Sequence, residues 1–185
     1  EIKSVFGRDA RVIHNWFTKK EAQGRDLKED FGIEDNMIFF VGRHTEQKGL
    51  EHLLYGFKKF LEDNSGTLVL GGKGHMQEAL QEFTNILKIE DNVIFPGFIA
   101  DEQLGDYYSS ADVFVSPSIN EPFGLTITEA LEHKTPVVAA ESGAEEILPD
   151  NTIVKVSPNS DEISLGIEEA LEKDIGHIEG RSWKK

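Results

Sequence analysis

Short apolar runs alternate with amphipathic segments along almost the whole chain, and this alternation limits its fold more than any other feature. The apolar runs lack strict polar alternation, which is typical of parallel strands covered on both faces. Predicted strands span Arg11–His14, Met37–Gly42, Thr67–Gly71, Asn92–Phe95, Asp112–Ser116, Pro136–Ala140 and Thr152–Val156, and predicted helices span Thr18–Phe31, Gly49–Asp63, Met76–Leu87, Asp101–Ser109, Gly124–His133, Gly143–Leu148 and Asp161–Lys173. Repeated β-α units with right-handed crossovers predict an α/β fold, a Rossmann-like three-layer α/β/α sandwich with a doubly wound parallel sheet.

The composition limits the classes of protein and of partner. At 185 residues, with 38% hydrophobic and 29% charged residues, the chain suits one globular domain. It has no cysteine, which excludes disulfides and fits a cytoplasmic protein, and no apolar run approaches the length of a membrane helix. A net charge of -15 argues against nucleic acid as a partner. The sequence contains neither clustered histidines nor an Asp-x-Asp pair that would indicate a metal site. We therefore predict no metal.

Two carboxylates, Glu121 and Glu129, flank the start of the helix predicted from Gly124. Glu121 follows a predicted strand, and Glu129 lies one to two turns into the helix. Ligands of open α/β sheets bind at this carboxyl edge, and carboxylates there can accept hydrogen bonds from polyol hydroxyls. In the alternative interpretation, Glu121 only favours the helix N-terminus electrostatically and Glu129 is a solvated helix residue.

Two cations, Arg43 and Lys48, stand in the loop between the strand predicted to end at Gly42 and the helix predicted to begin at Gly49. Together with the amides of a glycine-containing turn, they could neutralise a diphosphate. The alternative is a polar loop with two solvated cations. In so acidic a chain, two cations at the ligand edge favour the diphosphate interpretation.

Two further loops follow predicted strands at the same edge. Gly72 and Gly74 form half of a dinucleotide fingerprint, but its third glycine would fall at Gln77, which disfavours a nicotinamide cofactor. Close approach of a ligand to the backbone and a purely structural turn both stay open. The run from Phe95 to Ile99 could lie against a nucleotide base, or it could be core packing with a turn glycine.

Together, these motifs resemble the C-terminal, nucleotide-sugar-binding domain of GT-B glycosyltransferases, specifically the glycosyltransferases group 1 family (family four). The matching elements are Val41-Gly42-Arg43 with Lys48-Gly49, Gly72-Lys73-Gly74, Val93-Ile94-Phe95-Pro96-Gly97-Phe98, Ser116-Pro117-Ser118, Glu121-Pro122-Phe123-Gly124-Leu125 with Glu129-Ala130, and Pro136-Val137-Val138-Ala139. The likeness covers roughly Val12 to Leu171. It departs from the common family pattern at His14-Asn15-Trp16 and at His133-Lys134.

The resemblance implies a role for each matching residue. Arg43 and Lys48 match the basic pair that contacts the donor diphosphate and stabilises the leaving nucleotide. Glu121 matches the glutamate that faces the donor sugar and has been assigned catalytic roles, and Glu129 matches the one that binds the ribose hydroxyls. The other implied donor-binding positions are Gly42, Gly72, Gly74, Ile99, Phe123, Gly124 and Leu125.

The resemblance also implies a function for the protein. We expect residues 1–185 to be the donor-binding half of a retaining glycosyltransferase that takes a hexose from a UDP-, GDP- or ADP-sugar, with no further cofactor. An N-terminal domain, outside this sequence, would supply the acceptor site and access to a saccharide, lipid-linked or membrane acceptor. We therefore expect this chain alone to bind nucleotide weakly and to transfer no sugar. The alternative is a non-catalytic module or partner subunit that binds nucleotide-sugars.

Overall fold

The computed structural model of the chain describes residues 7, 20–119, 121, 123–140, 148 and 152–172. The strand predicted over Arg11–His14 lies outside the described residues. So does the helix predicted over Gly143–Leu148, except for its last residue.

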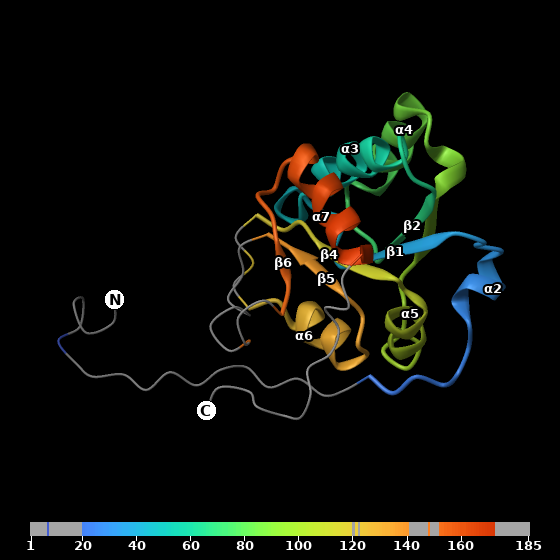
Figure 1. The fold of residues 1–185 in the computed structure, drawn as a ribbon, viewed down its shortest axis with the longest axis vertical. Helices are drawn as coiled ribbons and strands as arrows, with labels where there is room; N and C mark the ends of the chain where they lie inside the picture. The colour runs from blue at the N-terminus through green and yellow to red at the C-terminus, as the bar shows by residue number, and fades with distance from the viewer. Residues whose placement is uncertain are drawn as a thin grey trace.

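The centre of the fold is a six-stranded parallel sheet with the strand order β3-β2-β1-β4-β5-β6 (Figure 1). Its strands are β1 (Asn36–Val41), β2 (Gly66–Gly71), β3 (Val93–Gly97), β4 (Val113–Ser116), β5 (Val137–Ala139) and β6 (Val154–Lys155). The chain builds outward from β1 to β3 and then returns to the other side of β1 for β4. This is the doubly wound order of a Rossmann-like sheet, and the predicted fold class is confirmed.

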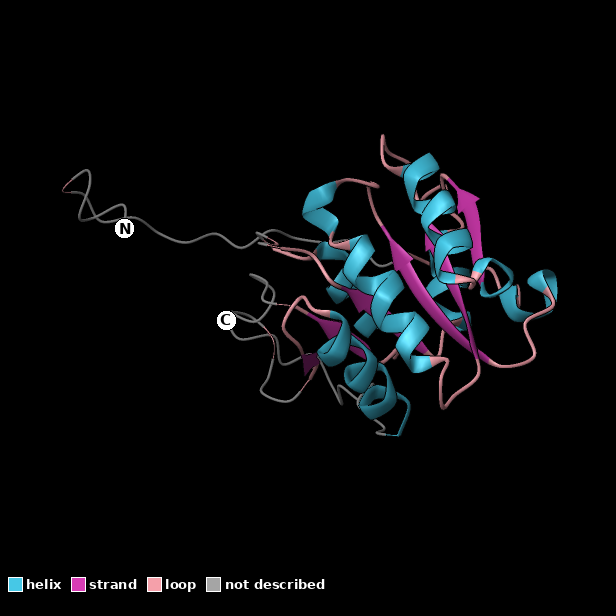
Figure 2. Cartoon of the chain, turned by 90° about the horizontal axis from the view of Figure 1, so that it is seen from above, coloured by secondary structure: helices cyan, strands magenta, loops and turns pink. Residues whose placement is uncertain are grey.

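Helices cover both faces of the sheet, as the two views of Figures 1 and 2 show. One face carries α3 (Leu50–Phe60), α4 (Gln77–Leu87) and α7 (Ser160–Glu172), and the other carries α2 (Leu27–Phe31), α5 (Leu104–Ser110) and α6 (Leu125–Glu132). Two short 3-10 helices, η1 (Glu46–Lys48) and η2 (Glu90–Asn92), lie in the connections. The described chain therefore has the three predicted layers.

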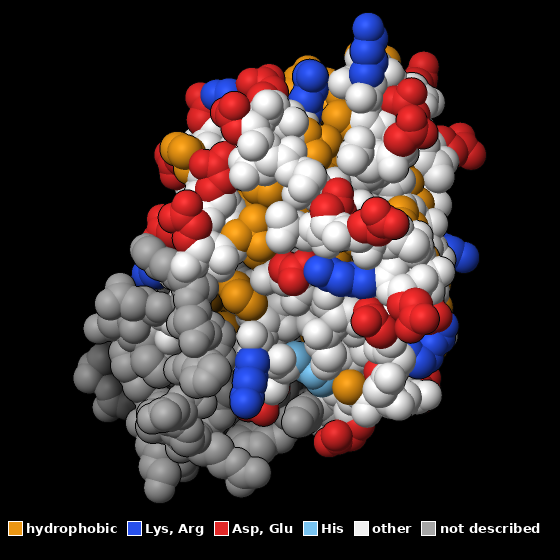
Figure 3. Space-filling model, turned by 45° about the vertical axis from the view of Figure 1, so that its right-hand side comes forward, with side chains coloured by type: hydrophobic (Ala, Val, Ile, Leu, Met, Phe, Trp, Pro, Cys, Tyr) orange, Lys and Arg blue, Asp and Glu red, His pale blue; other side chains and the backbone are white. Residues whose placement is uncertain are grey.

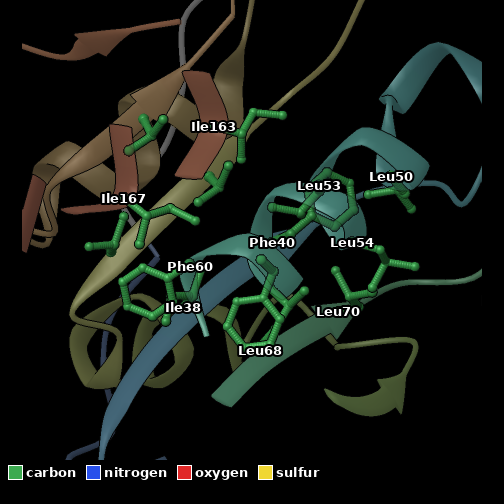
Figure 4. Packing of buried hydrophobic residues seen from close by; sticks show 14 of the residues in the cluster. Ile38, Phe40, Leu50, Leu53, Leu54, Phe60, Leu68, Leu70, Ile163 and Ile167 are labelled. Atoms are coloured by element: carbon green, nitrogen blue, oxygen red, sulfur yellow. The ribbon is translucent and has the colours of Figure 1, made fainter. Parts of the chain in front are cut away.

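Strand β1 shows why the strands read as continuous apolar runs. Ile38 and Phe40 pack into the core layer under α3 and α7 (Figure 4), whereas Met37 and Phe39 pack into the layer under α5 and α6. All four side chains are buried. Because both faces of a doubly wound sheet are covered, neither side of the strand can be polar.

The helix predicted over Thr18–Phe31 is wrong over most of its described part, because α2 begins only at Leu27. The Asp26 side chain caps α2 by accepting hydrogen bonds from the amides of Lys28 and Glu29. The segment before it is held by a distant residue. One carboxylate oxygen of the buried Asp106 accepts the backbone N–H groups of residues 23, 24 and 25, at 2.6, 3.0 and 3.3 Å. These contacts replace the hydrogen bonds that a helix would have made there.

Candidate functional site

The site is built where β1 and β4 lie side by side, the point at which the strand order reverses. In doubly wound sheets, the crevice beyond the carboxyl ends of the strands at this point is where ligands bind. The loop after β1 and the loop after β4 touch there. The Ile119 amide donates to the Gln47 carbonyl at 2.8 Å, and a Cβ on Gly49 would lie 2.4 Å from the Pro117 carbonyl oxygen.

These two loops bring Lys48 and Glu121 into direct contact. Lys48 Nζ lies 2.5 Å from Glu121 Oε2, and the two side chains are only 19% and 15% exposed. Lys48 ends η1 immediately before Gly49, whose positive φ of 62° turns the chain into α3. Arg43 lies on the same loop; it is exposed, and its side chain makes no hydrogen bond or ion pair with the described residues. Lys48 and Glu121 thus meet at this edge, and Arg43 lies on the same loop as Lys48. The sequence did not predict the direct pairing of Lys48 with Glu121, and binding of a diphosphate by the two cations stays a prediction.

The glycines after β2 pack this loop against the loop after β1. The amide of Gly42 donates to the Gly71 carbonyl, and the amide of His44 donates to the Lys73 carbonyl. Gly72 has a φ of 112°, and a Cβ on it would lie 1.9 Å from the Gly42 carbonyl oxygen. For Gly74, the corresponding distance to the His44 carbonyl oxygen is 2.2 Å. Close contact between the loops therefore explains both glycines, and a contact of either with the donor stays a prediction.

His44 adds no charge of its own to this part of the site. Its ring is buried and lies edge-on to Phe95, with the ring centroids 6.3 Å apart. Burial lowers the pKa of His44, although the Gly71 carbonyl opposes this effect. The imidazole is thus neutral at neutral pH, and the positive charge of the loop comes from Arg43 and Lys48.

The N-terminus of α6 faces the same region. Gly124 precedes the helix with a φ of 76°, and its carbonyl accepts the amides of Ile127 and Thr128. A Cβ on Gly124 would lie 3.5 Å from Glu121 Cγ, so the first helical turn borders the Lys48–Glu121 pair. Phe123 is half-buried and Leu125 is 39% exposed. These residues lie where a helix N-terminus favours an anion, and their contact with a donor phosphate stays a prediction.

Glu129 is not a solvated helix residue, so that alternative is wrong. The residue is only 9% exposed, and its Oε2 accepts a hydrogen bond of 2.8 Å from the Tyr108 hydroxyl. Burial raises the pKa of this carboxyl group, while the Tyr108 hydrogen bond and the positive charge of Lys20 lower it. A carboxylate kept in a buried position by a specific partner is typical of a functional group.

The segment predicted to contact the nucleotide base contains one buried residue, Ile99, and one exposed residue, Phe98. Ile99 is only 6% exposed, and its Cδ1 would lie 2.4 Å from a Cβ on Gly71, so its side chain packs beneath β2. Phe98 is 71% exposed. A base lying here would therefore meet the backbone and the Phe98 ring rather than the Ile99 side chain.

The sequence did not identify Tyr108, Lys20 and Asp106. Asp106 holds the segment from residue 23 to 25 on α5, whereas Tyr108 and the charge of Lys20 act on Glu129. Asp106 and Tyr108 are both buried polar residues on the short helix α5, which packs on the sheet. Polar residues on a core-facing side are the signal that could have identified them.

The described part of the chain has no helix that is both long and apolar enough to cross a membrane. Its described residues also contain no group of three or more His, Asp or Glu side chains placed to hold a metal ion. Asp and Glu side chains are spread over the face seen in Figure 3, with Lys and Arg side chains between them.

The sheet order defines a doubly wound, Rossmann-like domain with the Lys48–Glu121 pair at the point where the strand order reverses. A sequence model of the family Glycosyl transferases group 1 matches residues 25–184. The chain therefore belongs to the Glycosyl transferases group 1 family, and the resemblance inferred from its motifs is confirmed.

Individual relatives agree with this assignment. An uncharacterized glycosyltransferase of Methanocaldococcus jannaschii is 38% identical over 186 residues, which cover 92% of this chain and 48% of that protein. The C-terminal domain of LpcC, a glycosyl transferase group 1 family protein of Francisella tularensis, has a TM-score of 0.72 at 26% identity, covering 84% of this chain and 86% of that one. HepE of Anabaena, solved in complex with UDP, has a TM-score of 0.70 at 27% identity, covering 81% and 43%. The chain spans about half the length of the archaeal relative.

Proposed function

We propose that this chain is the donor-binding half of a retaining glycosyltransferase that transfers a hexose from a UDP-, GDP- or ADP-sugar to a saccharide, lipid-linked or other hydroxyl acceptor. The observation that carries the proposal is the contact of Lys48 with Glu121 at the reversal point of the sheet, with Arg43 on the same loop as Lys48. Membership of the Glycosyl transferases group 1 family supports it, as does the complex of HepE with UDP.

Arg43 and Lys48 are proposed to neutralise the donor diphosphate. When the bond between the sugar C1 and the phosphate oxygen breaks, negative charge grows on the leaving nucleoside diphosphate. Preorganised cations at that position stabilise the transition state more than the ground state. Lys48 is largely buried, which strengthens its interaction with a phosphate relative to that of a fully solvated lysine.

Glu121 is proposed to face the transferred sugar. As C1 acquires oxocarbenium character, a nearby carboxylate stabilises the developing positive charge and can accept hydrogen bonds from sugar hydroxyls. The ion pair with Lys48 places this carboxylate beside the proposed phosphate position, because the two groups are 2.5 Å apart. The diphosphate and the sugar would then lie on either side of one Lys–Glu contact.

Retention of anomeric configuration follows if the acceptor hydroxyl attacks C1 from the face that the diphosphate leaves. The C1–phosphate bond breaks, a new C1–O bond forms on the same face, and the acceptor proton leaves with a phosphate oxygen. This route requires no nucleophile from the protein. In this mechanism, the main catalytic role of this half is the stabilisation of the leaving nucleoside diphosphate by Arg43 and Lys48.

The proposal predicts that the 185-residue chain binds a nucleoside diphosphate but transfers no sugar, since the acceptor site belongs to an N-terminal half. A longer protein that includes that half should transfer hexose to an acceptor, and the proton NMR coupling of the new anomeric centre should match that of the donor. Transfer by the 185-residue chain alone, or a product of inverted configuration, would contradict the proposal. A longer protein that binds nucleotide-sugar without transfer would favour the non-catalytic module instead.

A further inference from the structure

The Tyr108 hydroxyl is held in a fixed position by the packing of its ring. Tyr108 lies in α5 and is fully buried. Its ring meets Phe39 and Phe114 edge-on, with centroid distances of 5.5 Å for both pairs, and stacks on His133 at 5.7 Å. Because the ring is enclosed by three neighbours, its hydroxyl has little freedom to turn away from the position it holds.

That hydroxyl serves one acceptor. It donates to Glu129 Oε2 at 2.8 Å, and among the described residues it is the one hydrogen-bond donor to this carboxylate. The hydrogen bond engages Oε2, and Oε1 accepts no hydrogen bond from the described residues. A vicinal diol, such as the 2′ and 3′ hydroxyls of a ribose, needs an ionised carboxylate in a fixed orientation, because both hydroxyls donate to it.

We propose that Tyr108 is a positioning residue for ribose recognition, and that its hydroxyl holds the Glu129 carboxylate in the orientation that accepts the ribose hydroxyls. The proposal rests on the proposed function, in which Glu129 contacts the ribose. It assigns a specificity role to a residue that would not itself touch the ligand. Its consequence is that the choice between ribonucleotides and deoxyribonucleotides depends on the Tyr108 hydroxyl.

The charges around Glu129 predict the direction of a pH effect. Burial raises the pKa of Glu129, the Tyr108 hydrogen bond and the charge of Lys20 lower it, and Asp101, which pairs with Lys20 at 2.7 Å, raises it. His133, the residue immediately after α6, stacks on the tyrosine ring. As pH falls through the pKa of Glu129, the carboxyl group gains a proton and loses acceptor capacity, so the preference for ribose should weaken. Removing the Tyr108 hydroxyl should move this loss to higher pH.

The test compares Tyr108→Phe with Tyr107→Phe, the matched control, which removes a hydroxyl from the neighbouring tyrosine. The 185-residue chain is titrated calorimetrically with UDP, GDP and ADP and with their 2′-deoxy forms. We expect the wild type to prefer the ribose form by about ten-fold, as for a hydrogen bond to a charged group. Tyr108→Phe should lose most of this preference with little change in affinity for the deoxy form, whereas Tyr107→Phe should keep it.

Each other outcome has a distinct meaning. If Tyr108→Phe keeps the wild-type ribose preference, the positioning role is wrong and the proposed function stands. If the wild type binds ribo and deoxy forms equally, the ribose role of Glu129 is wrong and the inference falls with it. If no nucleotide binds, the proposed function itself fails. Because Tyr108→Phe could perturb packing, the ribose preference of both the wild type and Tyr108→Phe is also followed as the pH is lowered; a loss of preference that does not move to higher pH in the variant would overturn the inference independently.

Discussion

Replacing Gly72 with alanine is expected to lower the free energy of unfolding by about 4 kcal/mol, from a steric clash added to backbone strain. The new Cβ would lie 1.9 Å from the Gly42 carbonyl oxygen, and the φ of 112° is one that residues other than glycine rarely adopt. The clashing oxygen belongs to the backbone, so relief of the clash requires the loops after β1 and β2 to separate. Since domains of this size are stable by about 5–15 kcal/mol, chemical denaturation should show a large fall in the midpoint.

Gly32→Ala is the matched control for this prediction. Gly32 also has a positive φ, of 67°, but an added Cβ there has no atom within 4 Å. Gly32→Ala should therefore lower the free energy of unfolding by only about 1 kcal/mol, which is the penalty for the left-handed conformation alone. A Gly72→Ala protein no less stable than Gly32→Ala would show that the two loops are not packed as described.

Replacing Glu121 with glutamine is expected to lower turnover of the longer, acceptor-containing protein by about 10²- to 10³-fold, while affinity for the nucleoside diphosphate is kept or rises about three-fold. The transferred sugar loses the carboxylate that stabilises its developing positive charge. Lys48 loses the ion-pair partner 2.5 Å away and becomes fully available to the diphosphate. Steady-state rates and calorimetric titration with the nucleoside diphosphate measure the two effects separately.

Glu51→Gln is the control, because it removes the same charge from the first turn of α3 without touching the Lys48–Glu121 pair. It should change neither turnover nor affinity by more than about two-fold, as for an exposed charge. Loss of nucleotide affinity with normal turnover in Glu121→Gln would contradict the role proposed for Glu121.

The sequence predicted the layers and the edge at which the site lies, because apolar runs between amphipathic helices admit few topologies. It also predicted that Arg43, Lys48 and Glu121 follow strand ends. Periodicity does not tell which side chains reach one another across distant segments, so the ion pair between Lys48 and Glu121 could not be predicted. The same holds for the hydrogen bond from Tyr108 to Glu129.

The error in the helix predicted before Leu27 has a related cause. A helical pattern of polar and apolar residues was present, but the acceptor that holds residues 23–25 is Asp106, which lies about 80 positions further along the chain. Local propensity is a weak prior that a tertiary contact of this kind overrides. The helix prediction therefore failed in the segment whose backbone amides donate hydrogen bonds to a residue far away in the sequence.

The central claim, that Arg43 and Lys48 bind the donor diphosphate, is tested most directly by calorimetric titration of the 185-residue chain and its Arg43→Ala and Lys48→Ala variants. UDP, GDP and ADP are each compared with their monophosphates. We predict that each substitution weakens binding of the best diphosphate by about ten-fold or more, and that binding of the monophosphate changes much less. Diphosphate binding that neither substitution weakens would contradict the claim.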